Sequence, residues 1–595
     1  MDQANGRSIN NYLSAGSTGV VDNQYTFRGD HAAGTKARLF GRFSTYRVKS
    51  PSAPIIPGPL DPRVGDSLTT GYQASSSWTH IWAPNLITEG WLGFQRNNPA
   101  IDPPSLGINV REALGIQRHS FAATPVMNIS GWTSMGINSN TYRRQIDNNY
   151  QGSFSVTWTR GNHSVKTGFQ LRKNQFNVFN PGGNFAGVYN FNGQLSSPLR
   201  SAGNPIHALA DFLQGYVKTA NYDLPQPMTG RRNSNFGAFV QDDWKFSRRL
   251  TVNAGVRYEL ETPMTMSNNI YSRVDPVSGR LLAAGKNATR SLNLEAAKLN
   301  LAPRVGLAYS RDEKTVVRSA FGVFFSQIFS NLGGVVLYPG FTVAQSFPDL
   351  GVGVAQPFRF TEGMPLIAVQ DLNDPFIVER NASVSNPLAA SAQFGEINPM
   401  PHSLQWNFGI QRELARGNIL DVSYVGTRGL NLPLNLAQNP IPFERGDELA
   451  RLATTADQQR ARKFPTVNSL NSFVHAGTSS YHSLQVKAVR QFTRGLGYHA
   501  VYTWSKSLDD GSGLFPFSQP YGLDAGQFPF LLRYLDRSIS SFDRPHSFAG
   551  ALQIRSRGPV WLRDFTVSPI FVVRTGLPDT ITQNNLSPGV VQQRP

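Results

Sequence analysis

The sequence predicts an all-β fold, an antiparallel β-barrel that spans a membrane. Three observations predict it. Charge is low although hydrophobicity is only moderate, apolar and polar residues alternate along segments of about ten residues, and short connections take turns with long ones.

Composition favours strands and a surface without much charge. Hydrophobic residues make up 40% of the 595-residue chain and charged residues only 16%, against roughly 25% charged residues in average soluble proteins. Glycine (54), phenylalanine (38) and tyrosine (19) are abundant, which is typical of strands and loops. No stretch of about 18 apolar residues is present. We therefore expect sheets that are apolar on one face and polar, but mostly uncharged, on the other.

The residue counts also exclude some chemistry. With no cysteine, disulfide frameworks, thiolate zinc sites and thiol catalysis are excluded. The net charge of +18 suggests nucleic acid, but the basic residues are scattered rather than gathered in a stripe, so we expect no nucleic-acid partner. Residues 1–5 lack the basic and apolar regions of a signal peptide. We expect either a cytoplasmic chain or a piece that begins within a longer precursor.

Alternation with a period of two is clearest in residues 149–158. One face there carries Tyr150, Gly152, Phe154, Val156 and Trp158, and the other is polar. The pattern recurs in 163–172, 250–259, 404–411 and 496–505. We expect these outward-facing residues: Phe154, Val156, Phe169, Val252, Val256, Tyr498 and Tyr502. We expect these inward-facing residues: Gln151, Lys166, Arg257, Arg304 and Thr503. Strict alternation indicates strands with one apolar and one polar face.

The connections separate a barrel from a soluble β-sandwich, which also alternates. Short turns are expected near 33–35, 83–85, 159–162, 245–249, 311–314, 415–418, 493–495 and 555–563. Long loops are expected near 49–67, 97–146, 174–232, 260–298, 326–401, 428–478 and 507–541. Soluble domains rarely contain loops beyond about 15 residues without secondary structure. Outer-membrane barrels have short periplasmic turns and long extracellular loops, and the sheet must close because backbone groups in the bilayer must be paired.

About sixteen strands are expected, in eight hairpins. The paired ranges are 24–32 with 36–48, 67–82 with 86–96, 147–158 with 163–173, 233–244 with 250–259, 300–310 with 315–325, 403–414 with 419–427, 480–492 with 496–506, and 542–554 with 564–577. Four aromatic residues directly precede short turns: Trp82, Trp158, Trp244 and Tyr309. This placement predicts an aromatic girdle at the inner membrane interface.

The direction of the strands predicts where the ends lie. The first strand leads into a short turn and the last leads away from one, so both ends should be extracellular. Complete barrels normally keep both ends in the periplasm, so an odd number of strands is expected to be missing at each end. Adding about six to about sixteen restores the roughly 22 strands of outer-membrane transporters. We expect loop segments from truncation at 1–23 and 579–595, and a barrel at 24–578.

Several stretches carry a family resemblance that covers about residues 24–578. Residues 236–245 (FGAFVQDDWK) and 250–259 (LTVNAGVRYE) resemble a barrel hairpin of TonB-dependent receptors. Residues 302–309 (APRVGLAY), 421–429 (DVSYVGTRG) and 502–507 (YTWSKS) resemble the Oar-like subgroup. The resemblance implies a plug domain inside the barrel, a TonB box, and energy from an inner-membrane complex. The sequence itself shows neither plug nor TonB box.

The function implied is that of an outer-membrane TonB-dependent transporter or receptor barrel that moves a large or scarce substrate. The alternative is an unplugged porin-like channel or an adhesin of the same architecture. An enzyme would need Asp and His, or Ser and His, clustered at one rim, and no such cluster can be assembled, so no enzyme and no cofactor are expected. The expected location is the Gram-negative outer membrane. The expected partners are its lipid and lipopolysaccharide, the plug domain, the TonB complex, and a substrate that the sequence does not reveal.

Candidate site residues are basic residues on polar faces. Six are candidates for contact with the plug or a substrate: Lys166, Arg172, Arg257, Arg304, Arg318 and Lys487. Two interpretations remain open: these six side chains contact the plug or a substrate, or they contact only water in a hydrated lumen. The run at 460–463 either meets lipopolysaccharide phosphates or is simply solvated. The histidines lack metal-binding spacing, and Asp242 and Asp243 face opposite sides of a strand, so no metal site or carboxylate dyad is expected.

Overall fold

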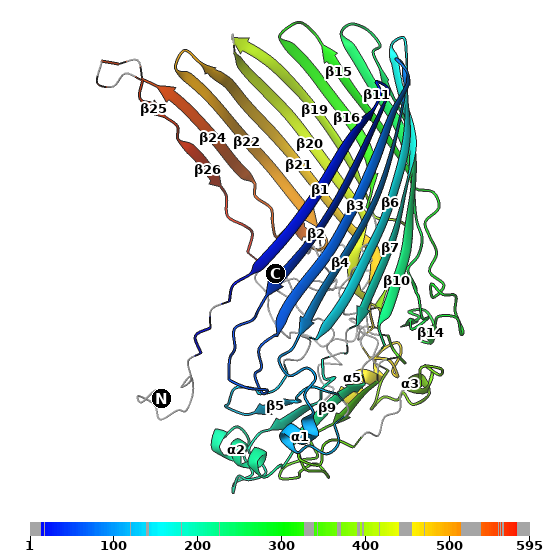
Figure 1. The fold of residues 1–595 in the computed structure, drawn as a ribbon, viewed down its shortest axis with the longest axis vertical. Helices are drawn as coiled ribbons and strands as arrows, with labels where there is room; N and C mark the ends of the chain where they lie inside the picture. The colour runs from blue at the N-terminus through cyan, green and yellow to red at the C-terminus, as the bar shows by residue number, and fades with distance from the viewer. Residues whose placement is uncertain are drawn as a thin grey trace.

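One continuous sheet dominates the chain, as predicted, and forms a curved wall (Figure 1). It has 20 strands, where about sixteen were expected. The computed structural model describes residues 14–579 except 17, 120, 138–141, 180, 182, 225–226, 327–337, 342, 366–370, 389–392, 395–397, 416, 440–454, 469, 513–536, 557, 560 and 562–563. The expected terminal segments, 1–23 and 579–595, thus lie largely outside the described residues. No described helix has the length and apolar character needed to cross a membrane.

Sixteen long strands form the wall. Their bounds are β1 Val21–Ala33, β2 Ala37–Ser50, β3 Asp66–Ala83, β4 Leu86–Asp102, β6 Arg143–Arg160, β7 His163–Phe179, β10 Thr229–Trp244, β11 Leu250–Glu261, β15 Leu301–Ser310, β16 Thr315–Phe325, β19 His402–Ala415, β20 Asn418–Ala437, β21 Asn471–Thr493, β22 Leu496–Asp509, β24 His546–Arg555 and β26 Ile570–Arg574. Four two-residue strands complete the sheet: β12 Thr265–Met266, β18 Gln393–Phe394, β23 Ser538–Ile539 and β25 Thr566–Val567. All eight predicted hairpins are present.

Neighbouring wall strands pair antiparallel from β1 through to β26. The exception to antiparallel pairing in this sheet is the short β18, which pairs with β21 in parallel. Within the described residues, β1 pairs only with β2 and β26 only with β24, so the sheet does not close. An open sheet agrees with the expectation of about sixteen strands out of roughly 22.

Several strand boundaries differ from the predicted ones. For example, β4 and β7 extend to Asp102 and Phe179, beyond the predicted ends at 96 and 173. Two further differences have a clear physical reason. The expected loop at 428–478 is partly strand, because β20 and β21 continue pairing as far as Ala437 and Asn471. The register of this pairing shifts near Gly429 and Pro433. Glycine and proline are typical of turns, so the sequence predicted a loop where the ladder is interrupted but continues. The predicted last strand, 564–577, is divided into β25 and β26. Pro569 lies between them, and proline has no N–H to donate to a ladder.

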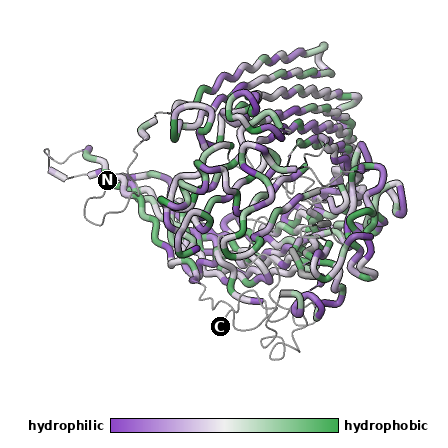
Figure 2. The backbone as a smooth tube through the Cα atoms, turned by 90° about the horizontal axis from the view of Figure 1, so that it is seen from below, coloured by the Kyte–Doolittle hydropathy of each residue, from purple (hydrophilic) through white to green (hydrophobic). Residues whose placement is uncertain are grey.

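The two faces of the wall differ as the alternation predicted, and Figure 2 shows hydrophilic and hydrophobic residues alternating along the strands. The register places Phe154, Phe169, Ala238 and Tyr258 side by side on one face. That face carries large apolar side chains that are strongly exposed, among them Phe27 (66%), Leu92 (65%) and Trp504 (56%). No second sheet covers it in the described part of the chain. All residues predicted to face outward lie on this apolar face.

The long connections gather at one end of the wall and the short turns at the other (Figure 1). Three long connections together build a four-stranded sheet, which the sequence did not predict. Its strands, in the order β17-β9-β8-β5, are Val343–Phe347, Thr219–Leu224, Val188–Phe191 and Val126–Ile129. The other elements of these connections are α1 Val110–Leu114, α2 Pro205–Leu213, α3 Ile377–Arg380, α5 Thr455–Arg460, β13 Ser272–Val274 and β14 Leu281–Ala283. We call the sheet β17-β9-β8-β5, with α1 and α2, the cap.

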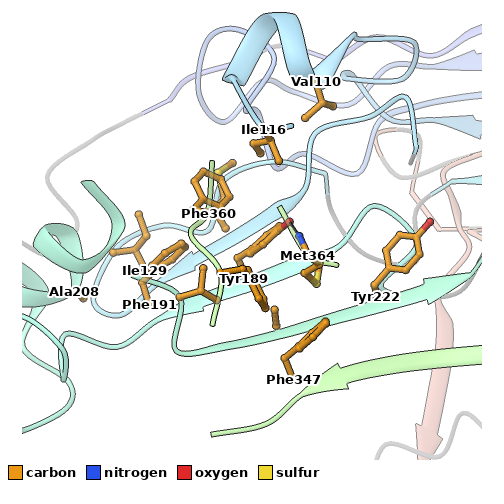
Figure 3. Packing of buried hydrophobic residues seen from close by; sticks show 14 residues of the cluster. Val110, Ile116, Ile129, Tyr189, Phe191, Ala208, Tyr222, Phe347, Phe360 and Met364 are labelled. Atoms are coloured by element: carbon orange, nitrogen blue, oxygen red, sulfur yellow. Dashed lines mark hydrogen bonds between the residues drawn. The ribbon is translucent and has the colours of Figure 1, made fainter. Parts of the chain in front are cut away.

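The cap has its own hydrophobic core (Figure 3). Tyr189 is fully buried at its centre, its hydroxyl accepts a hydrogen bond from the Met364 backbone N–H at 3.2 Å, and its ring meets that of Phe360 edge-on at 4.9 Å. The buried Lys218 joins two of the connections through its ion pair with Asp349 at 2.7 Å. The three connections therefore fold as one unit rather than as separate loops.

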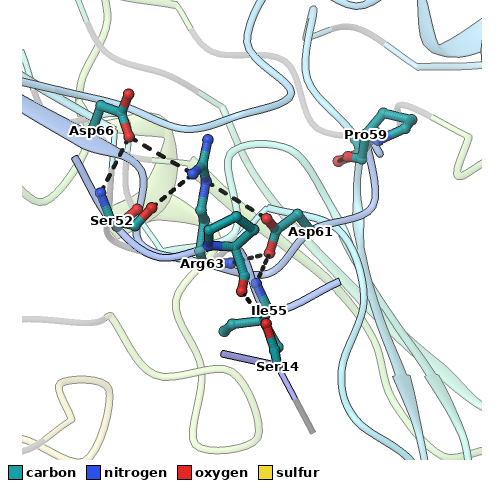
Figure 4. A network of polar contacts seen from close by, with 9 residues as sticks. Ser14, Ser52, Ile55, Pro59, Asp61, Arg63 and Asp66 are labelled. Atoms are coloured by element: carbon teal, nitrogen blue, oxygen red, sulfur yellow. Dashed lines mark hydrogen bonds and ion pairs between the residues drawn. The ribbon is translucent and has the colours of Figure 1, made fainter. Parts of the chain in front are cut away.

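The shorter β2–β3 connection is held by a polar network (Figure 4). The Arg63 guanidinium donates to the Ser52 carbonyl at 2.7 Å and lies 3.6 Å from the Asp61 carboxylate. The buried Asp61 also accepts from the backbone N–H of Ile55 at 3.1 Å. The buried carboxylate of Asp61 is stabilised because hydrogen-bond donors occupy its acceptor sites.

Candidate functional site on the polar face of the wall

The six basic candidate residues all lie on the polar face. The register aligns Lys166, Gln241, Gly255 and Arg304 in one row across β7, β10, β11 and β15. Arg172 lies opposite Asn235, Arg257 opposite Phe239, Arg318 opposite Gly409, and Lys487 opposite Asp421. The residues predicted to face inward, Gln151 and Thr503 included, share this face.

The structure brings three of the six together. Lys166 and Arg257 line a cavity of about 440 Å³, and Arg257 and Arg304 line a neighbouring cavity of about 470 Å³. Phe239 belongs to both cavities. Arg172, Arg318 and Lys487 line neither cavity. Arg318 instead donates to Gln411 at 2.6 Å.

Acidic and aromatic partners, which the sequence reasoning missed, hold these cations. Lys166 Nζ lies 2.9 Å from a Glu89 carboxylate oxygen, across the intervening strand β6. Arg257 forms an ion pair with Glu259 and donates to Gln170 at 3.2 Å. The Arg304 guanidinium lies 4.4 Å from the centre of the Phe324 ring, a cation–π contact. Much of the positive charge on this part of the wall is therefore compensated locally.

Small residues explain how long side chains meet across strands. Gly255, Gly306 and Gly322 line the 470 Å³ cavity, where the absence of side chains leaves space. The Phe324 ring lies over Gly322, so close that an added Cβ would come within 2.8 Å of it. An aromatic ring that covers a strand glycine in this way shields the backbone without projecting from the wall.

The aromatic residues of the polar face were missed because alternation assigns aromatic residues to the apolar face. Phe239 stands between Ala238 and Val240, and Trp91 precedes Leu92. A large apolar residue out of phase with its strand is the signal in the sequence that would have found them. The partners Glu89 and Glu259 carry no such signal in the sequence. The contact of Glu89 with Lys166, for example, depends on how β4, β6 and β7 are aligned.

The other polar clusters have different surroundings. His163 contacts Asp242 at 2.6 Å, whereas Asp243 faces the other side and bonds to Asn253. Among the described residues, no group of three or more histidines and carboxylates could hold a metal ion. In the run 460–463, Arg460 pairs with Asp457 at 2.6 Å, and Arg462 donates to the Asn439 carbonyl at 2.6 Å. That run is engaged with its own neighbours.

Comparisons with known proteins agree with this geometry. A family model described as "Outer membrane beta barrel domain" matches residues 1–595. Among solved structures, the outer membrane transporter YddB from Escherichia coli is similar with a TM-score of 0.54 at 10% identity, covering 96% of this chain and 58% of that one. FauA, the alcaligin outer membrane receptor of Bordetella pertussis, is similar with a TM-score of 0.44 at 11% identity, covering 93% of this chain and 60% of that one.

P. aeruginosa FpvA, solved with bound pyoverdines, gives a TM-score of 0.46 at 9% identity, covering 97% of this chain and 57% of that one. The chain thus spans under two thirds of the length of these structures. No curated protein matches the sequence.

Proposed function

Because this chain belongs to the outer membrane beta-barrel domain family, we propose that it forms the wall of a TonB-dependent transporter. It would move a large or scarce substrate across the outer membrane. The observation that carries the proposal is the wall itself: an exposed apolar face suited to lipid, and a polar face with cavities suited to a lumen. The motifs at 302–309, 421–429 and 502–507 support membership of the Oar-like subgroup.

The proposal assigns a side to each end of the molecule. The cap end is extracellular and the short turns are periplasmic, because barrels of this kind carry their long connections outside the cell. The six basic residues of the polar face then contact a plug domain or the transported substrate within the lumen. The apolar face contacts lipid, and the cap end meets lipopolysaccharide. The plug domain and the TonB complex are the protein partners.

Uptake measurements test the function. In the host organism, deletion of the coding sequence should leave in the growth medium a solute that the parent strain removes. Deletion of the energy-coupling TonB gene should leave the same solute, because transport needs energy. If uptake fails without this chain but persists without TonB, the porin-like alternative is correct. If no solute is retained after either deletion, the transporter proposal is wrong.

A further inference from the structure

A row of uncharged amides crosses the polar face near its cap end. The register places Gln73, Gln95, Asn149, Asn174 and Asn233 side by side on β3, β4, β6, β7 and β10. At a strand spacing of about 4.8 Å, the row is about 19 Å long. An extended ligand rather than a single small ring is needed to contact all of it.

The amides offer both donors and acceptors. Asn149 donates to Asn174 at 2.5 Å, and Asn174 donates to Asn235 at 3.1 Å, which fixes the orientation of this end of the row. At the other end, Gln73 and Gln95 are exposed, and their side-chain amides have no hydrogen-bond partner within the described residues. Each carries an unused carbonyl acceptor and an unused NH₂ donor.

A flat aromatic surface lies next to the row. Trp91 is four residues before Gln95 on β4, and its indole lies over Gly93, where an added Cβ would come within 2.6 Å of the ring. The same indole lines the 440 Å³ cavity, together with Phe239 and the hydroxyl-bearing Ser77 and Ser153. This volume falls within the range of about 300–1,000 Å³ that is typical of small-molecule sites.

The charges of the cavity are paired. Its two cations, Lys166 and Arg257, are bound to the carboxylates of Glu89 and Glu259. An anionic ligand would have to displace a carboxylate. A wholly apolar ligand would cover the amides and hydroxyls without giving them hydrogen-bond partners, which costs free energy. Hydroxyl groups both donate and accept, so they match amides and serines, while the C–H face of a sugar ring matches an indole face.

We propose that the amide row and the Trp91 cavity bind a neutral, polyhydroxylated chain, an oligosaccharide. The inference rests on the proposed function and deepens it, because it gives the transported substrate a chemical class. Trp91 supplies the stacking surface, and Gln73 and Gln95 bind hydroxyls along the row.

Binding of defined sugars by the intact barrel, purified in detergent, tests the proposal. The probes are maltoheptaose, cellohexaose and chitohexaose, with an oligogalacturonate as the acidic comparator, in isothermal titration calorimetry. At least one neutral probe should bind, and Trp91→Ala should weaken it at least about tenfold. Trp91→Phe should recover much of the affinity because it restores a ring. The matched control is Trp158→Ala, which removes an indole from the apolar face and should leave binding unchanged.

Three results would overturn the inference: no neutral probe binds, only the acidic probe binds, or Trp91→Ala binds as tightly as the parent. Circular dichroism of each variant confirms that its sheet has formed. Binding in detergent requires no transport, so the two proposals fail separately. Sugar binding without any uptake phenotype would contradict the transporter, whereas TonB-dependent uptake of a solute without sugar binding would contradict only the oligosaccharide site.

Discussion

Neighbouring residues of a wall strand face opposite sides of the sheet, one apolar and one polar. The side determines how much a charged substitution destabilises the barrel. Phe154 lies on the apolar face beside Phe169, with their ring centres 6.0 Å apart, whereas Gln151 lies on the polar face beside Arg172. At the midplane of a bilayer, arginine on the lipid face of a barrel costs about 2–4 kcal/mol. A polar face in contact with water tolerates it.

Phe154→Arg should therefore destabilise the barrel folded in lipid by about 2–4 kcal/mol if the position lies at the midplane, and Gln151→Arg by far less. Equilibrium refolding titrations into lipid vesicles measure both, with the intact barrel as the host. Equal losses for the two variants would show that the faces are wrongly assigned.

Protonation at one residue should loosen the cap. The hydrogen bond and ion pair from Lys218 hold the pKa of Asp349 below its ordinary value. A carboxyl whose pKa is lower in the folded state stabilises that state above its ordinary pKa, and this contribution is lost as the pH falls through the lowered value.

Hydrogen exchange near 217–219 and 349–354 should consequently speed up as the pH falls below about 4, the ordinary pKa of an aspartate, and on through the lowered pKa of Asp349, after correction for the intrinsic rate. Lys218→Met should weaken this pH dependence, because it removes the main cause of the lowered pKa of Asp349 and leaves only the hydrogen bond from the Gly351 backbone N–H. The same pH dependence in the variant would assign the effect to another carboxyl.

At the scale of elements, the cap and the wall are stabilised by different means. The wall strands are held by ladder hydrogen bonds and by their surroundings, whereas the cap has a packed core of the ordinary soluble kind. Phe360 contacts the rings of Tyr189, Phe191 and Phe212 at centroid distances of 4.9, 5.7 and 5.6 Å. Its removal should affect the cap far more than the wall.

Phe360→Ala should destabilise the cap by about 3–5 kcal/mol, as truncation of a buried phenylalanine does. Limited proteolysis should then cut the connections at 103–142 and 183–228 faster, while the wall strands stay protected. Leu199→Ala is the control, because Leu199 is 87% exposed. Loss of wall protection in Phe360→Ala would mean that the cap is needed for the wall to form.

At the scale of the whole molecule, the open sheet decides what the 595-residue chain does alone. Within the described residues, the outer edges of β1 and β26 pair with no strand, and each unpaired backbone group costs several kcal/mol in hydrocarbon. Exposed strand edges also pair with other chains. The isolated chain should therefore aggregate or insert imperfectly rather than form a stable pore.

Reconstitution into liposomes, with measurements of solute leakage and of heat-modifiable gel mobility, checks this expectation. We expect heterogeneous leakage and no discrete heat-modifiable band. A protease-resistant monomer with a defined pore would show that the edges close in lipid, and would favour the porin-like alternative.

The sequence by itself determined the wall strands and their two faces. Alternation is a local property with a period of two, and a short turn sets the register of the two strands it joins. Residues such as Phe169 and Lys166 could therefore be assigned to opposite faces, and all six basic candidates to the polar one. Boundaries were missed at interrupted ladders, near Gly429 and at Pro569, and where β4 and β7 run past their predicted ends to Asp102 and Phe179.

Only the tertiary structure decided the cap, the cavities and the amide row. The cap sheet pairs Val126 with Val188 and Val343 with Leu224, and no local pattern specifies partners so far apart in the chain. The cavity combines Glu89, Lys166 and Arg257 from β4, β7 and β11, because same-face neighbours on adjacent strands are set by the cumulative register of the whole sheet. A period of two tells which face a side chain takes, but its neighbours there depend on every hairpin between them.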